Sequence, residues 1–91
     1  MTEPIDTQYW AEKIGTNIRE NRKNLGLSLE DLSLLSSCTV PTLSYIERGK
    51  RNLKLSTLVS LATALRIKPS ELFQEDGGQR SSPKPDLDIL S

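Results

Sequence analysis

The chain has 91 residues, with twelve Lys and Arg balanced by twelve Asp and Glu, no histidine and a single cysteine, Cys38. That length allows one small domain. Without histidine and with one cysteine, the chain is not expected to form a tetrahedral zinc site, and it cannot form a disulfide within itself. The N-terminus does not resemble a secretory signal, and no apolar run approaches the roughly 20 residues that span a bilayer, so we expect a cytoplasmic protein without a membrane partner.

Charge is distributed unevenly along this neutral chain. Residues 9–73 hold ten Lys and Arg against six Asp and Glu, whereas residues 1–8 and 74–91 each carry a net charge of −2. The last segment is rich in Gly, Ser, Pro and Asp and has no sustained hydrophobic periodicity, which is typical of a disordered tail. We therefore predict an N-terminal arm over residues 1–8, one basic domain over residues 9–73 and a flexible acidic tail over residues 74–91.

The first predicted element is a helix over about residues 9–25. Ile14, Ile18 and Leu25 have spacings that place them on one helical face. Gly26 follows, and glycine is suited to the left-handed conformation that ends many helices.

A second helix is expected after Ser28. Ser28 and Asp31 have the spacing of a capping box, in which each side chain bonds the backbone N–H of the other residue. Leu32 and Leu35 follow as an apolar face. The helix can reach only to about Ser36.

Pro41 indicates the start of a third helix, because proline is tolerated in the first helical turn, where its missing N–H would have no partner. The N-cap is either Thr39 or Val40, since the residue before a proline avoids helical dihedral angles. Leu43 and Ile46 give this helix a short apolar face.

Two further helices complete the expected fold. Ser56 is a candidate cap for the fourth. Its apolar positions repeat at helical spacing: Leu58, Leu61, Ala62 and Leu65. Residues 69–73 predict a short fifth helix that begins at a proline. No segment predicts a strand, so the expected fold class is all-α with five helices.

Only residues 37–39 separate the second and third helices, and two short helices joined so closely predict a helix–turn–helix. In this motif the second helix lies in the major groove of DNA with its N-terminal residues towards the base edges. Val40 and Pro41 would then form an apolar tip able to touch thymine methyl groups. The hydrogen-bonding groups beyond this tip come from Thr42, Ser44 and Tyr45. The alternative is that Tyr45 is half-buried in the core and that the two hydroxyl residues are merely solvated.

Over residues 11–73 the sequence resembles the lambda-repressor/Cro-like (XRE) helix-turn-helix domains. The resemblance is carried by the segments IGTNIRENRKNLGLSLEDLS, TLSYIERGKRNLKLSTLVSLATAL and KPSELF, in that order. Within the family, the segment RNLKLSTL most resembles the controller proteins of restriction–modification systems. The resemblance implies a lambda-repressor-like helical domain that binds double-stranded DNA.

The resemblance also implies roles for individual residues. Arg22 and Glu47 match a family salt bridge that ties the first helix to the recognition helix. Positions that face DNA bases, or lie beside them, are matched by Val40, Pro41, Thr42, Ser44 and Tyr45. The loop along the phosphate backbone is matched by Arg48, Lys50, Arg51, Asn52 and Lys54. Hydroxyls or helix N-terminal amides that hold phosphates are matched at Ser28 and Thr39.

Three residues depart from the family pattern. Leu29 stands where Gln is common, Ser37 where the turn usually has Gly, and Ser33 where Ala is usual. The first change puts one common DNA contact in doubt, and Ser37 must adopt a geometry that Gly takes more easily. Because the helix tip is apolar, we expect groove shape to carry more of the specificity.

The expected function is that of a sequence-specific transcriptional regulator that binds a palindromic operator as a homodimer. It would act as a repressor or, if of the controller type, also as an activator that contacts RNA polymerase. Leu72 and Phe73 are candidates for the dimer interface, with a core role as the alternative. The main competing function is an antitoxin that binds a toxin through residues 87–90. Without histidine, a Gly-rich phosphate loop or clustered carboxylates, neither an enzyme nor a bound metal or cofactor is expected.

Overall fold

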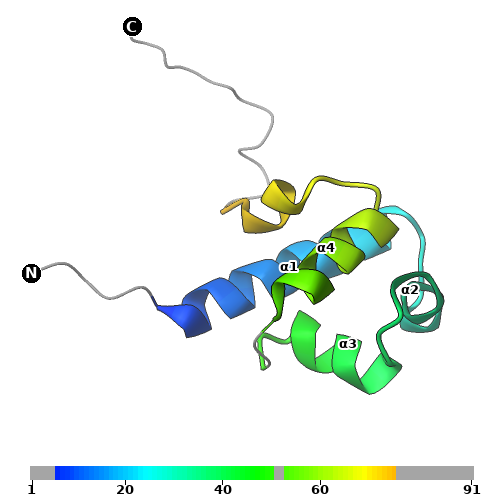
Figure 1. Ribbon diagram of the computed structural model, residues 1–91, viewed down its shortest axis with the longest axis horizontal. Helices are drawn as coiled ribbons and strands as arrows, with labels where there is room; N and C mark the ends of the chain where they lie inside the picture. Colours follow the sequence, from blue (N-terminus) through cyan, green and yellow to red (C-terminus); the bar gives the residue numbers. More distant parts are fainter. Residues whose placement is uncertain (1–5, 51–52, 76–91) are drawn as a thin grey trace, which may run out of the picture.

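The computed structural model describes residues 6–50 and 53–75, and these form the all-helical arrangement of Figure 1. The elements in chain order are α1 (Thr7–Asn24), α2 (Leu29–Ser36), α3 (Val40–Glu47), α4 (Leu55–Ala64) and the 3₁₀ helix η1 (Pro69–Phe73). The expected fifth α-helix is therefore a 3₁₀ turn, because this five-residue segment is closed by the short-range bond from Glu71 N–H to the Lys68 carbonyl, 2.9 Å. None of the described helices is both long and apolar enough to cross a bilayer.

The first helix, α1, is the central element of the fold. It packs against α3 on one side and η1 on the other, while α2 contacts both α3 and α4 (Figure 1). The core between these elements is almost entirely aliphatic and consists of Ile14, Ile18, Leu32, Leu43, Ile46, Leu58, Leu61, Ala62, Leu65 and Leu72. Branched aliphatic side chains supply the burial that holds a domain of this size together.

Leu35 is not part of this core, contrary to the expected apolar face of α2. Its side chain is 58% exposed, whereas Leu32 and Ser36, one turn apart, face inward. The Ser36 hydroxyl donates to the Leu32 carbonyl (2.7 Å), and the Ser60 hydroxyl donates to the Ser36 carbonyl (2.8 Å). The small polar Ser36 thus takes the inward position because it connects α2 to α4.

The N-terminal end of α1 lies earlier than expected. Asp6 is the N-cap, and its carboxylate accepts from the Tyr9 N–H at 3.2 Å. Thr7 and Gln8 therefore belong to the helix and not to an arm. At the other end the helix stops at Asn24, and Gly26 takes the expected left-handed conformation at φ +73°.

Capping groups fix the ends of the next two helices. The capping box of α2 is confirmed, with Asp31 N–H donating to the Ser28 hydroxyl (3.0 Å) and Ser28 N–H donating to the Asp31 carboxylate (2.9 Å). The backbone N–H of Ser28 and, after it, the Ser28 hydroxyl stabilise the charged carboxylate and so lower the pKa of Asp31 from its ordinary 3.8. Thr39, and not Val40, caps α3, because its hydroxyl accepts from the Thr42 N–H.

The prediction that Ser56 caps α4 is wrong. Lys54 occupies the N-cap position without a side-chain cap bond, and Ser56 lies inside the helix. At the C-terminal end of the described chain, the buried Asn17 side chain donates to the carbonyls of Leu72 (2.8 Å) and Gln74 (2.7 Å). Asn17 thereby holds η1 against α1. The predicted tail lies, from residue 76 onward, outside the described residues.

Candidate nucleic-acid interface

Gly15 allows α1 and α3 to approach through their backbones. A Cβ atom at this position would lie only 2.2 Å from the Ile46 carbonyl oxygen and 2.8 Å from the Glu47 carbonyl oxygen. The C-terminal end of α3 is therefore seated directly on α1. Sequence reasoning missed this role. A glycine in the middle of a helix lowers the stability of that helix, so its presence there is a signal that another backbone packs closely against it.

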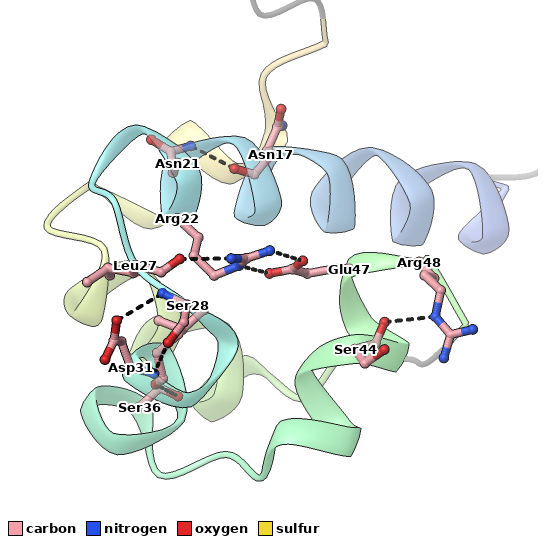
Figure 2. A network of polar contacts seen from close by, with 11 residues as sticks. Asn17, Asn21, Arg22, Leu27, Ser28, Asp31, Ser36, Ser44, Glu47 and Arg48 are labelled. Atoms are coloured by element: carbon pink, nitrogen blue, oxygen red, sulfur yellow. Dashed lines mark hydrogen bonds and ion pairs between the residues drawn. The ribbon is translucent and has the colours of Figure 1, made fainter.

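A buried ion pair completes the junction between α1 and α3. The Arg22 guanidinium donates to both carboxylate oxygens of Glu47, at 2.7 Å from Nε and 3.0 Å from Nη2, and its Nη1 donates to the Leu27 carbonyl at 2.8 Å. The two side chains are only 11% and 6% exposed, and Figure 2 shows the guanidinium lying between its two partners. The bond with Glu47 raises the pKa of Arg22 against the opposing effect of burial, so the pair stays ionised.

With its inner side fixed, α3 presents a continuous outer side. Leu43 and Ile46 point into the core, while Pro41 and Tyr45 are exposed. The remaining predicted DNA-facing residues are half-buried, and they are Val40, Thr42 and Ser44. No residue predicted to face bases is sealed inside the molecule.

Tyr45 and Arg48 form one unit at the C-terminal end of this outer side. The Arg48 guanidinium lies over the Tyr45 ring, 5.2 Å from its centroid, and its Nε donates to the Ser44 carbonyl at 3.3 Å (Figure 2). Tyr45 is 47% exposed and is not part of the hydrophobic core, so its outer surface is available. Stacking holds the guanidinium on the same side of α3 as the tyrosine.

Two hollows are lined by α3 residues together with neighbouring elements. The first, about 360 Å³, is lined by Arg19, Arg22, Leu29, Ser44, Glu47 and Arg48. Its single carboxylate, Glu47, is already paired with Arg22, so Arg19 and Arg48 give it a positive character. Sequence reasoning did not assign Arg19 to this surface, although it lies one turn before Arg22, whose expected pairing with Glu47 already indicated that this side of α1 reaches α3.

The second hollow, about 320 Å³, combines hydroxyl groups with one cation. It is lined by Ser37, Cys38, Thr39, Thr42, Ile46, Leu53, Lys54 and Thr57. Ser37 adopts φ 65°, the left-handed conformation expected where the family has Gly. The exposed hydroxyl of Thr39 donates to the Thr42 hydroxyl (2.9 Å), so a ligand at Thr39 competes with this bond.

The turn after α3 leads to the predicted phosphate-contacting loop. Arg48, Lys50 and Lys54 are all exposed, as is Ser28 at the start of α2. The two other predicted residues of the loop, Arg51 and Asn52, lie outside the described residues.

An apolar groove lies beside the N-terminal end of α1. Its volume is about 340 Å³, and it is lined by Thr7, Ala11, Ile14, Leu53, Lys54, Leu55, Leu58 and Phe73. Phe73 is 43% exposed and packs against Trp10 at a ring-centroid distance of 5.9 Å. Leu72, in contrast, is fully buried within the single chain, so it has no surface to offer to a second copy and belongs to the core.

The sequence model of the HTH_3 family, described as helix-turn-helix, matches residues 18–72, more than half of the chain. The chain belongs to this family. The matched segment contains α2, the turn and α3, and thus the whole motif described above. The family is of the XRE type, as the sequence resemblance indicated.

Named relatives of the domain are regulators. The chain is 39% identical over 62 residues to the HTH-type transcriptional regulator DdrOP3 of Deinococcus deserti. The match covers 68% of this chain and 48% of that protein, so the chain spans about half the length of this relative. It is 35% identical to the control protein C.SmaI of Serratia marcescens, covering 72% of this chain and 79% of C.SmaI.

A solved structure of a controller protein is also similar to this chain. The restriction–modification controller protein C.AhdI of Aeromonas hydrophila superposes with a TM-score of 0.67 at 44% identity, covering 69% of this chain and 96% of that one. The similarity to controller proteins is therefore found in both sequence and structure.

Proposed function

We propose that the protein is a sequence-specific DNA-binding transcriptional regulator that acts as a homodimer on a palindromic operator. The observation that carries the proposal is the outer side of α3, which is exposed, flanked by cations and mounted on α1 through a buried ion pair. A recognition element must hold its shape when it enters the major groove, because ordering it on binding would lower the affinity.

Base reading is assigned to the outer side of α3. Val40 and Pro41 form an apolar tip suited to thymine methyl groups, and Ser44 and Tyr45 carry hydroxyls suited to base edges or phosphates, with Thr42 beside them. Few polar groups are available for direct readout. The operator is therefore recognised in part through groove shape and deformability.

Phosphate contacts are assigned to the cations and hydroxyls around α3. Ser28, Thr39, Arg48, Lys50 and Lys54 are exposed at these positions. Arg51 and Asn52, which lie outside the described residues, are also predicted to contact phosphates. Together the cations attract the DNA backbone, and binding should weaken as salt rises because bound counterions are released.

A second copy is the proposed occupant of the apolar surface beside α4. Leu55, Val59 and Phe73 are exposed there, next to the apolar groove. Large apolar side chains gathered on the surface of a small domain are typical of an interface. Two copies related by a two-fold axis would read half-sites about 34 Å apart, one turn of DNA.

The mode of action is assigned from the similarity to controller proteins. Occupancy of a promoter by the dimer would exclude RNA polymerase and repress transcription. If the protein follows the controller type, a dimer bound beside the promoter would also contact the polymerase and activate. Both modes need the same operator binding.

Selection of bound sequences from a random DNA pool tests the proposal. The expected result is a palindromic consensus. Phe73→Asp should yield a monomer with much weaker operator binding, whereas Leu34→Asp, which changes an exposed leucine on α2, should leave the dimer intact. A pool without enrichment, or a Phe73→Asp variant that still dimerises and binds normally, would contradict the proposal.

A further inference from the structure

We infer that Gln8, which the sequence places in an N-terminal arm, is a positioning residue for DNA binding: it sets the direction in which the chain leaves α3 at Lys50. This inference rests on the proposed function. Gln8 lies in the first turn of α1, and its side-chain amide reaches the turn after α3. Forty-one positions separate the two residues that meet there.

One carboxamide nitrogen makes both contacts. Gln8 Nε2 donates to the Gly49 carbonyl oxygen at 3.0 Å and to the Glu12 carboxylate at 2.9 Å. The two N–H bonds of the amide group supply these two hydrogen bonds, so both donors of the side chain are used. Glu12, one turn further along α1, orients the amide, and Gly49 is the group that is held.

The peptide between Gly49 and Lys50 is therefore held from both sides. Its C=O accepts from Gln8, and its N–H donates to the Tyr45 carbonyl at 2.9 Å. The bond to Tyr45, together with the bond from Gly49 N–H to the Ile46 carbonyl (3.0 Å), forms a Schellman ending of α3. A peptide plane fixed at both ends leaves little freedom for the direction of the next residue, Lys50.

The turn is also pressed against the backbone of α1. Gly49 is buried at φ +72°, and a Cβ atom there would lie 2.6 Å from Glu12 Cγ and 2.8 Å from Glu12 Cα. The packing fixes where the turn lies, and the Gln8 amide fixes how its last peptide is rotated. Since Lys50 comes next in the chain, this rotation decides how the Lys50 ammonium group meets a phosphate backbone.

The test replaces Gln8 with methionine, which keeps the length of the side chain and removes its donors. Thr16→Met is the matched control, because Thr16 is exposed on α1 and lies eight residues further along the helix than Gln8. The measurements on the full chain are the melting temperature, the affinity for the selected operator over a salt series, and the hydrogen exchange of the Lys50 amide relative to that of Leu43.

For Gln8→Met we expect the Lys50 amide to exchange faster and the affinity to fall about two- to tenfold, the effect of one net hydrogen bond. The salt dependence should flatten by up to about 0.9 in log–log slope, one phosphate contact. The lost bond also belongs to the fold, so the melting temperature should fall slightly below that of Thr16→Met. Wild-type affinity and slope in Gln8→Met would overturn the inference, as would an affinity loss that the unfolded fraction of the variant fully accounts for. Failure of the wild-type protein to select any DNA would instead overturn the proposed function.

Discussion

The two sides of α3 differ in almost every physical respect. The inner side, with Leu43, Ile46 and Glu47, is packed against α1 through a glycine contact and a buried bidentate ion pair. The outer side, with Pro41, Tyr45 and Arg48, is open and carries aromatic, hydroxyl and cationic groups with few partners within the described chain. One short helix thus holds the fold with its inner side and leaves open the outer side, which we propose contacts DNA.

From this division we expect substitutions on the two sides of α3 to affect stability and DNA affinity differently. Changes on the inner side should lower the free energy of unfolding first and DNA affinity only as a consequence. Changes on the outer side should lower affinity at constant stability. Substitutions on each side of the helix test this division.

Gly15→Ala should have the largest effect. The new methyl group would meet the Ile46 carbonyl oxygen at 2.2 Å, so α1 and α3 must separate, and we expect the protein to lose about 3 kcal/mol or more of stability. Chemical denaturation measures the loss. Gly26→Ala is the control, since that site has open space around it and costs only the strain of a positive φ, about 1 kcal/mol. Equal losses in the two variants would contradict the close approach of the helices.

Glu47→Gln should be the next most damaging, because it leaves the Arg22 guanidinium buried without a counter-charge. The expected loss is about 2–3 kcal/mol, below the range for fully buried pairs since both side chains keep some exposure. Glu20→Gln removes an exposed carboxylate from α1 and should change stability little. A Glu47→Gln variant with normal stability and weak DNA binding would move Glu47 from the inner side to the interface.

Arg48→Ala should lower affinity without affecting stability. The side chain is exposed and its loss should flatten the salt dependence of operator binding by about 0.9 in log–log slope. Lys13→Ala is the control, because that ammonium group belongs to α1 and lies over the Tyr9 ring, whereas Arg48 belongs to the end of α3. Arg51→Ala should behave like Arg48→Ala. A salt slope identical to that of the wild type would remove the substituted arginine from the phosphate contacts.

The smallest effect concerns the capping box of α2. Because the pKa of Asp31 is lowered in the fold, its contribution to stability is present above the ordinary value of 3.8 and is lost as the pH falls through the folded value. Asp31→Asn should therefore melt slightly earlier at neutral pH and show a flatter decline in melting temperature on acidification. If wild type and variant lose stability in parallel below pH 4, the cap does not depend on the charge.

Local signals in the sequence predicted much of the fold. The capping box of Ser28 and Asp31, the proline near the start of α3 and the glycine after α1 all act within a few residues, so their patterns can be recognised without knowing the tertiary structure. The aliphatic periodicity similarly predicted most of the core.

Contacts between distant segments could not be predicted in this way. Gly15 and Gln8 act on residues more than 30 positions away, and neither lies in a pattern that names its partner. Leu35 was misplaced because periodicity alone does not tell which of two adjacent faces of α2 is buried. The Arg22–Glu47 pairing was implied by the family resemblance and not by the residues themselves.

An NMR titration of the selected duplex into the labelled protein shows where on the protein DNA binds. If it binds to the outer side of α3, we expect the largest backbone amide shifts at Val40, Thr42, Ser44, Tyr45, Arg48 and Lys50, with small shifts at Lys13, Thr16 and Thr63. Large shifts at these last three residues, with the amides of α3 unmoved, would contradict it.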